Sequence, residues 1–140
     1  MGLKLSIDAN IFISVINQEE NYETCKKILN SIEAKKIEGY VSAIVISEIL
    51  VGYFRNKEFD KVKRFSSYMK NHFHITKVDL EIALKAAKLR AENKIKLPDA
   101  MIIASSRNTD FLITLDERIK KQNPEKILYP NELWEKIKKK

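Results

Sequence analysis

The sequence predicts an α/β fold built on a parallel sheet. Short apolar or alternating segments typical of strands are separated by longer segments with helical periodicity, and no two strand candidates are joined by a hairpin turn. The chain has 140 residues, of which 44% are hydrophobic and 32% are charged. This length and composition are typical of one globular domain, and we expect residues 1–140 to form it.

The first half of the chain predicts three strands and three helices. Residues 4–8 (KLSID) alternate apolar and polar side chains, as a strand at the edge of a core does. The segment IFISVI is apolar but too short for a long helix, and we expect Gly39 to end the helix that follows it. The predicted elements are a strand over 4–8, a turn at 9–10, a helix from Asn21 or Thr24, a strand from Tyr40, helices over 43–54 and 57–69, and a strand over 73–76.

Two helices of this half carry further predictions. Ser42 is expected to cap the helix AIVISEILVGYF, which is apolar on nearly every side and is therefore predicted to be buried. Phe59 is placed on the packing face of the helix over 57–69. Cys25 lies on an apolar stripe and is predicted to be a core residue, and as the only cysteine it excludes an internal disulfide.

The second half is organised around residues 97–119, LPDAMIIASSRNTDFLITLDERI. Pro98 suits the first turn of a helix, and Asp99 falls in the same turn. A turn over 107–110 then leads to a short apolar strand, FLIT, which we expect to be buried on both faces, and Asp116 lies just beyond its end. The other predicted elements are a helix capped by Asp79 and ending near Lys94, a strand over 126–128 and a helix after Pro130.

Charge and hydropathy restrict the classes of function. The net charge of +7 is compatible with a polyanionic partner, although the lysine clusters also fit ordinary solvated helix faces. No apolar run approaches a membrane span and no signal peptide is recognisable, so we expect a cytoplasmic protein. The sequence has no cysteine and histidine cluster for structural zinc.

Three acidic residues stand alone in apolar surroundings. Asp8, Glu48 and Asp99 are the only charged residues within residues 5–18, 39–54 and 97–106, respectively. An ionised carboxylate in an apolar setting is costly unless it is paired or bound to a metal ion. Since no lysine or arginine is close in sequence, a shared cation would neutralise all three.

The predicted topology allows these acids to meet a fourth. Asp8 and Asp116 each follow a strand, and in open α/β sheets ligands bind beyond the carboxyl ends of the strands. Carboxylates without histidine or thiol ligands suit Mg²⁺ or Mn²⁺, and such ions, singly or in pairs, promote attack of water on phosphorus. The sequence therefore predicts a divalent-metal site for phosphoryl hydrolysis.

Each acid also has a purely structural interpretation. Asp99 would stabilise a helix N-terminus by roughly 0.3–1 kcal/mol through the helix dipole. Asp116 could cap the turn DERIKK, and Asp8 could be a turn residue after a strand. Glu48 is the hardest to explain structurally, because a buried helix has little use for a single glutamate.

Four segments resemble the PIN-domain ribonucleases, in particular the VapC-type toxins of toxin–antitoxin pairs. They are SIDANIFI, SAIVISEIL, LPDAMIIASS and FLITLDERI, in the order that the family has them, and AAKLRAENKIKLPDA is also similar. The resemblance implies a three-layer α/β/α fold with a central parallel sheet, and Mg²⁺- or Mn²⁺-dependent cleavage of RNA. It also implies a homodimer that is inhibited by an antitoxin inserted into the active-site groove.

Carried over by position, the resemblance implies that Asp8, Glu48, Asp99 and Asp116 form the catalytic, metal-binding site. Asn10 and Thr114 would support it through hydrogen bonds. Two positions depart from the family pattern: Ala9 replaces a common Thr or Ser, and Leu115 replaces a common basic residue.

Other classes of function make different demands on the sequence. A haloacid-dehalogenase-type phosphatase would want an aspartate at the position of Asn10, and a receiver domain would want a lysine after a late strand. A PIN-fold nuclease of RNA processing, without an antitoxin, and a non-catalytic module that binds RNA or protein remain alternatives. Arg90 and Lys94 are candidates for contact with RNA or a partner, or they face solvent, whereas His72 and His74 are expected to be structural.

Overall fold

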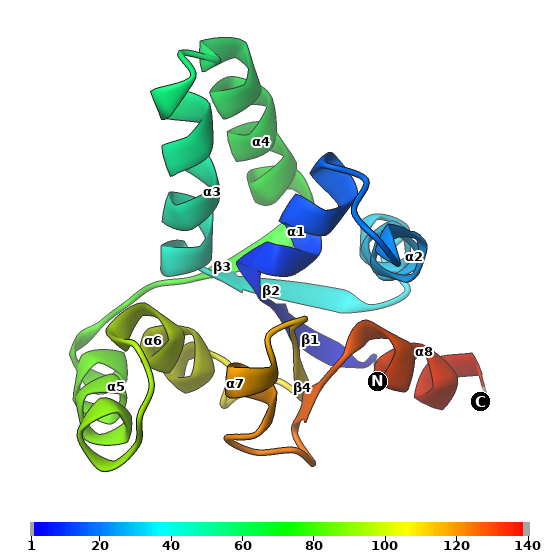
Figure 1. The fold of residues 1–140 in the computed structure, drawn as a ribbon. Coiled ribbons are helices and arrows are strands. Elements are labelled where there is room, and N and C mark those ends of the chain that lie inside the picture. The colour runs from blue at the N-terminus through cyan, green and yellow to red at the C-terminus, as the bar shows by residue number, and fades with distance from the viewer. Residues whose placement is uncertain (1, 139–140) are drawn as a thin grey trace.

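The computed structural model describes residues 2–138 and contains a five-stranded sheet (Figure 1). All four pairs of neighbouring strands are parallel, in the order β3-β2-β1-β4-β5, so the predicted α/β class is confirmed. The strands are β1 (Lys4–Ile7), β2 (Glu38–Ser42), β3 (Phe73–Thr76), β4 (Phe111–Ile113) and β5 (Ile127–Leu128).

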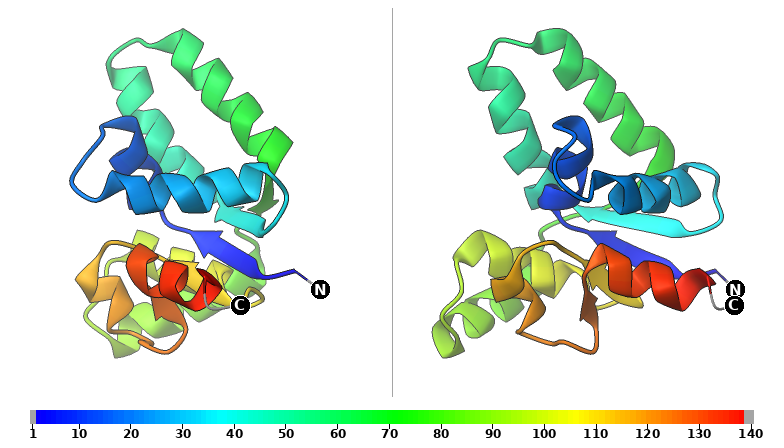
Figure 2. Two further views of the ribbon diagram at one scale, coloured as in Figure 1. Left: turned by 90° about the vertical axis from the view of Figure 1, so that its right-hand side faces the viewer. Right: turned by 45° about the vertical axis from the view of Figure 1, so that its right-hand side comes forward.

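Helices cover both faces of this sheet. Figures 1 and 2 show α1 to α4 on one side and α5 to α8 on the other, which confirms the three-layer arrangement. The first group is α1 (Ala9–Ile16), α2 (Tyr22–Glu33), α3 (Ala43–Arg55) and α4 (Phe59–His72). The second group is α5 (Leu80–Glu92), α6 (Leu97–Ser105), α7 (Glu117–Lys120) and α8 (Pro130–Lys138).

The strand order places a topological switch point between β1 and β4. From β1 the chain moves outward to β2 and β3, and then it crosses to the other side of β1 to form β4 and β5. Ile7 pairs in register with Ile113, so the residues that follow these two strands emerge side by side. Crevices at such switch points are the usual binding sites of open α/β sheets.

The core explains why the central strands read as apolar runs. Leu5, Leu112 and Ile113 have no exposed surface, as expected of strands covered on both faces. Cys25 is also fully buried and lies in the same hydrophobic cluster, which confirms that it is a core residue.

Two boundaries in the first half differ from the prediction. No separate turn follows β1, because the Asp8 side chain accepts a hydrogen bond from the Ala9 N–H and α1 begins at once. Gly39 does not end a helix but lies inside β2. A β-carbon at Gly39 would come within 2.8 Å of side-chain atoms of Ile32 and Phe73, so the strand needs glycine for close packing.

The prediction that α3 is a buried helix is wrong. Its Ser42 cap is confirmed, with the hydroxyl accepting from the Ile44 N–H at 3.3 Å, but only Val45 and Ile49 of the helix are buried. Helices α3 and α4 project from the sheet as a pair, with an exposed tip that includes Phe54 and Phe59 (Figures 1 and 2). Phe59 therefore does not pack as predicted.

Within residues 2–138, no helix combines the length and the apolar character needed to cross a membrane.

The packing around β2 makes a prediction about its glycine. Gly39→Ala should lower the free energy of unfolding by about 1–3 kcal/mol, because the new methyl group overpacks the buried Ile32 and Phe73 side chains. Gly52→Ala is the matched control, since a β-carbon at this α3 position meets no atom within 4 Å. We expect it to stabilise by about 0.5–1 kcal/mol. Equal denaturation midpoints for Gly39→Ala and the wild type would contradict the packing argument.

Candidate active site

Asp8 lies at the centre of the candidate site. It follows β1 directly, is only 4% exposed, and donates its backbone N–H to the Ile113 carbonyl of β4 at 3.0 Å. Its Oδ1 accepts a hydrogen bond from the Ala9 N–H at 2.7 Å, as the cap of α1. The side chain is therefore fixed at the switch point by the first helix of the chain.

Asn10 and Thr114 hold the other oxygen of this carboxylate. Asp8 Oδ2 accepts from Thr114 Oγ1 at 2.7 Å and from Asn10 Nδ2 at 3.1 Å, and Thr114 is fully buried. Asn10 Oδ1 in turn accepts from the Leu115 N–H at 3.0 Å. The amide and the hydroxyl thus join the end of β1 to the end of β4.

Thr114 also positions the fourth acid. Its Oγ1 accepts a hydrogen bond from the Asp116 N–H at 3.0 Å while it donates to Asp8. Asp116 then caps α7, because its Oδ1 accepts from the Arg118 N–H at 2.8 Å. The cap proposed from sequence is present, and the charge of Asp116 still acts on Asp8 and Asp99.

Glu48 and Asp99 approach this pair from opposite layers. Glu48 projects from the middle of α3, and Asp99 lies in the first turn of α6, after Pro98. Helices α3 and α6 contact each other, and the Ser105 hydroxyl donates to the Ser42 hydroxyl at 3.3 Å where they meet. Glu48 is exposed, so it is not the isolated buried glutamate that the sequence suggested.

The acids influence one another electrostatically. Burial raises the pKa of Asp8 to about 6, with the charges of Asp99 and Asp116 adding to the rise. Partial desolvation, followed by the charges of Asp8 and Asp99, raises the pKa of Glu48 to about 7. The Glu48 side chain reaches solvent on one side and lines a pocket with Ile13 and Ile49 on the other, which accounts for its desolvation.

Asp99 and Asp116 differ in how their charge is compensated. Burial and the charge of Asp116 raise the pKa of Asp99, while Arg118 and Lys96 oppose the rise. Partial burial alone would raise the pKa of Asp116, but the hydrogen bonds and charge of Arg118 hold it below its usual range. The Arg118 guanidinium lies 3.4 Å (Nε to Oδ1) and 3.3 Å (Nη2 to Oδ2) from the Asp116 carboxylate.

This donor set fits a hard divalent cation. All four candidate ligands are carboxylates, and among residues 2–138 none of Asp8, Glu48 and Asp99 forms an ion pair. The arrangement is open: no three acidic, histidine or cysteine side chains of that range form a ready-made metal cluster. A bound ion would have to draw the carboxylates together.

Arg118 was not recognised as a site residue from the sequence. Its signal was the spacing in Asp116-Glu117-Arg118, which places a basic side chain back on the acid that caps its helix. Leu115 stands where the family commonly has a basic residue just before the fourth acid. Arg118 follows Asp116 in the sequence and brings a cation to that acid from this side instead. The missing hydroxyl at Ala9 leaves Asp8 with three hydrogen-bond donors, one of them the Ala9 N–H.

The remaining candidate residues from the sequence are two bases and two histidines. Arg90 and Lys94 line a small pocket together with Asp99 and Arg118. His74 stacks on Tyr40 with ring centroids 4.6 Å apart, and His72 lies against Tyr68 on α4. Neither histidine is among the groups that shift the pKa values of the four acids.

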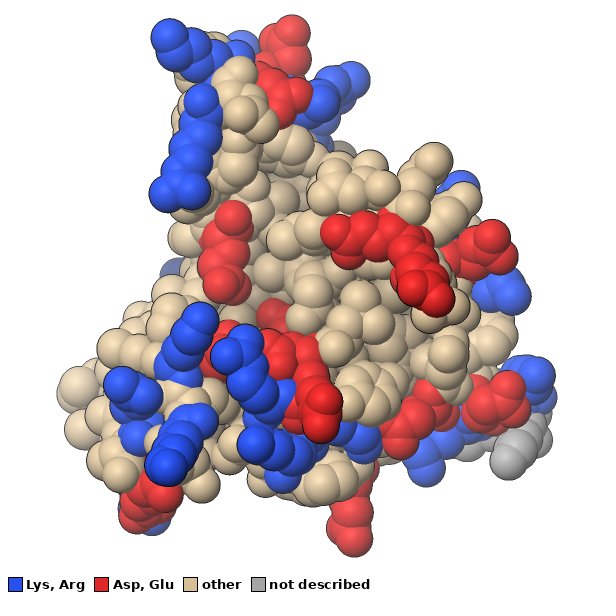
Figure 3. Space-filling view, in the orientation of Figure 1, with Lys and Arg blue, Asp and Glu red and all other residues tan. Residues whose placement is uncertain are grey.

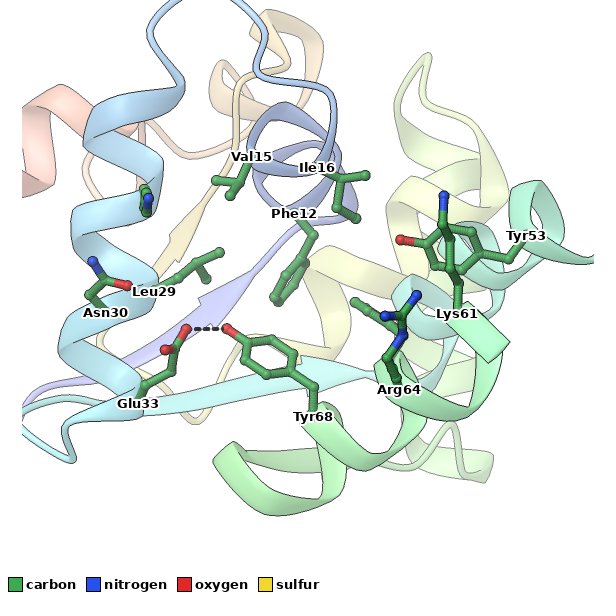
Figure 4. Close-up of a pocket in the computed structure, with 12 residues that line it drawn as sticks. Phe12, Val15, Ile16, Leu29, Asn30, Glu33, Tyr53, Lys61, Arg64 and Tyr68 are labelled. Atoms are coloured by element: carbon green, nitrogen blue, oxygen red, sulfur yellow. Dashed lines mark hydrogen bonds between the residues drawn. The ribbon is translucent and has the colours of Figure 1, made fainter. Parts of the chain in front are cut away.

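A larger apolar pocket of about 530 Å³ opens between α1, α2 and the α3–α4 pair (Figure 4). Phe12 and Leu29 point into it, and the Tyr68 hydroxyl donates to Glu33 Oε2 at 2.7 Å along one wall. Lys61 and Arg64 stand at its rim. It shares Ile16, Tyr53 and Lys61 with the pocket that Glu48 lines, so the two pockets adjoin and lead to Glu48.

Comparison with known proteins identifies the family. A model of the PIN domain matches residues 5–123, and the chain belongs to the PIN-domain family. No curated protein matches the chain. The PIN-domain resemblance that the sequence motifs suggested is confirmed by this match, and the solved structures that follow share the fold.

Three solved structures have the same fold. A toxin–antitoxin complex from Klebsiella pneumoniae is 27% identical, with a TM-score of 0.71, over 90% of this chain and 97% of the other. VapBC2 from Rickettsia felis, bound to a DNA fragment from its promoter, is 17% identical, with a TM-score of 0.72, over 91% and 98%. VapC20 from Mycobacterium tuberculosis, a sarcin–ricin loop cleaving toxin, is 14% identical, with a TM-score of 0.70, over 85% and 95%.

The raised pKa of Asp8 predicts a pH-dependent stability. A carboxyl group whose pKa rises from 3.8 to about 6 on folding stabilises the fold fully below about pH 4, and this contribution is lost as the pH rises through about 6. The loss for the buried Asp8 is roughly 3 kcal/mol. Metal-free wild-type protein should therefore unfold at lower urea concentration at pH 7.5 than at pH 5.

Asp8→Asn should flatten this dependence, because the amide does not ionise. Asp60→Asn, an exposed substitution on α4, is the control and should leave the wild-type profile in place. Urea melts between pH 4 and 8 measure the effect. A wild-type profile that does not change between pH 5 and 7.5 would show that burial of Asp8 carries no such cost.

The hydrogen bond from Thr114 predicts a second effect on Asp8. Thr114→Val keeps the shape of the side chain but removes the donor that lowers the pKa of Asp8, so that pKa should rise above its wild-type value. Thr114→Ser retains the hydroxyl and is the matched control. Carboxyl ¹³C NMR titration measures both variants, and an identical Asp8 titration in Thr114→Val and the wild type would refute the arrangement.

Proposed function

We propose that the protein is a metal-dependent endoribonuclease and the toxin of a type II toxin–antitoxin pair. One observation supports the proposal: near the switch point of a PIN-domain sheet four carboxylates are coupled through their charges, and three of them form no ion pair among the described residues. A cluster of unpaired carboxylates is unfavourable for folding, which points to a ligand that neutralises it.

The roles of the residues follow from their contacts. The ligands of Mg²⁺ or Mn²⁺ would be Asp8, Glu48, Asp99 and Asp116. The bound ion would supply polarisation of a phosphoryl oxygen and activation of a water molecule. Asn10 and Thr114 fix the orientation of the Asp8 carboxylate in advance, so that its reorganisation costs little. Within residues 2–138, no basic group offsets the charges of Asp8 and Glu48, whereas Arg118 and Lys96 partly offset that of Asp99.

An antitoxin is the proposed protein partner. The structures of similar fold include toxin–antitoxin complexes, one of them 27% identical to this chain. The apolar pocket lined by Phe12 and Leu29 offers a surface for an amphipathic segment, and its connection with the pocket of Glu48 would bring that segment to the acids. The basic rim formed by Lys61 and Arg64 favours a segment that carries acidic residues there.

We also propose that two copies associate, as the resemblance to VapC-type toxins implies. Leu80 and Leu84 on α5 are 75% and 64% exposed and provide apolar surface away from the four acids. Large exposed leucines on one helix are typical of an interaction surface.

The proposed activity predicts metal-dependent cleavage of structured RNA. Purified protein should cleave a mixture of ribosomal and transfer RNA in Mg²⁺ or Mn²⁺, and EDTA should abolish the reaction. Asp8→Asn and Asp99→Asn should each lower the rate at least about 100-fold, because each removes a negatively charged ligand from the metal site. A bound metal ion contributes several kcal/mol to transition-state stabilisation, and this contribution depends on its carboxylate ligands.

Two controls define the outcome. Asp60→Asn removes an acid outside the cluster and should cleave at the wild-type rate, and circular dichroism should show that all variants are folded. Wild-type cleavage that persists in EDTA, or that is retained by Asp8→Asn, would contradict the proposal.

A further inference from the structure

A second, basic pocket adjoins the acids on the side of α5 and α6. It has a volume of about 330 Å³ and is lined by Arg90, Asn93, Lys94, Ile95, Lys96, Asp99 and Arg118. Four of these seven residues are basic and one is acidic. Figure 3 shows Lys and Arg side chains gathered over this part of the molecule, directly beside acidic side chains at the centre of the same face.

The loop between α5 and α6 holds this pocket in place. Ile95 is 4% exposed and anchors the loop in a small core with Ile82 and Ala100. The Arg90 guanidinium donates to the Ile95 carbonyl at 2.6 Å, and the Asn93 side-chain amide donates to the Leu89 carbonyl at 3.0 Å. The basic residues are therefore presented by a fixed loop and not by a freely moving one.

The positive charge of the pocket is largely uncompensated. Within residues 2–138, none of Arg90, Lys94 and Lys96 forms an ion pair, and Arg118 is paired only with Asp116. Like charges held together are unfavourable unless an anion neutralises them. Lys96 and Arg118 also act on Asp99, so the positive field extends to the edge of the acidic cluster.

We propose that this pocket binds a backbone phosphate of the RNA strand, next to the phosphate that reacts at the four acids. The inference rests on the proposed function and adds where the RNA strand would lie beside the four acids. Asp99 belongs to both the pocket and the acidic cluster, and Arg118 lines the pocket while it pairs with Asp116, so an anion in the pocket would lie alongside the reacting group. Guanidinium and ammonium groups together are the usual donors to phosphate oxygens.

An acidic peptide is the competing ligand, because carboxylates bind the same cations. The phosphate is favoured by the position of the pocket, which adjoins the acids and has Ile95 as the one lining residue with an apolar side chain. The apolar surface suited to a peptide lies on the α1–α4 side of the molecule, around Phe12 and Leu29.

The test measures RNA binding without cleavage. Fluorescence anisotropy of a labelled 12-nucleotide single-stranded RNA in EDTA, at 50–200 mM KCl, compares the wild type with Lys94→Ala/Lys96→Ala. We expect affinity to fall about 10-fold at 100 mM KCl, and the slope of log affinity against log salt to become less negative by about 0.7 for each phosphate that the variant no longer binds. The control Lys63→Ala/Lys70→Ala removes the same charge from the exposed surface of α4 and should change affinity less than about 2-fold.

Three results would overturn the assignment of the pocket to an RNA phosphate. The first is an unchanged RNA affinity in Lys94→Ala/Lys96→Ala, and the second is an equal loss of RNA affinity in the α4 control. The third is that Lys94→Ala/Lys96→Ala loses binding of a labelled octaglutamate peptide but keeps binding of RNA. The third would identify a protein partner as the ligand.

Cleavage assays in Mg²⁺ separate this inference from the proposed function. If the wild type cleaves RNA and Lys94→Ala/Lys96→Ala raises KM more than it lowers kcat, both stand. Cleavage with an unchanged KM in that variant overturns the pocket and leaves the nuclease in place. RNA binding that depends on Lys94 and Lys96, without cleavage by the wild type, supports the pocket and overturns the nuclease.

Discussion

The hydrogen bonds that hold the buried Asp8 carboxylate organise this molecule. Thr114 and Asn10 donate to one oxygen of Asp8 and the Ala9 N–H donates to the other, so this side chain starts α1 and joins β1 to β4. Thr114 in turn accepts from the Asp116 N–H and positions that acid. A buried carboxylate without such donors would be far costlier. The parallel register of β1 and β4 is what brings these groups, about a hundred positions apart in the sequence, to one point.

The charge distribution follows from this arrangement. Acids gather at the switch point, where burial and mutual repulsion raise the pKa values of Asp8, Glu48 and Asp99. Among the described residues only Asp116 of the four acids forms an ion pair, with Arg118, whereas Asp99 lines a pocket with the other bases of this face. Folding therefore retains an electrostatic cost that a cation at the acids and an anion in the basic pocket would both relieve, and this is the physical basis of the proposed nuclease.

The sequence predicted most of the fold because strands, helix caps and apolar stripes are local signals. A common metal site for the four acids was predicted from their isolation and from the motif resemblance and stays a prediction, although their charges act on one another in the structure. The expectation of a buried Glu48 was wrong, since α3 packs against the core along one side, through Val45 and Ile49, and leaves Glu48 exposed. Arg90 and Lys94 were candidates for contact with RNA or a partner, but Arg118 was missed and the pocket that joins them was not predicted, because it depends on how the α5–α6 loop and α7 come together.

Anomalous X-ray diffraction from crystals soaked in Mn²⁺ would test the central claim most directly. The account predicts Mn²⁺ bound to carboxylates of the four-acid set including Asp8, with the Thr114 hydrogen bond to Asp8 retained and no ion in Asp8→Asn crystals. Mn²⁺ absent from this edge of the sheet, or bound without Asp8, would contradict it.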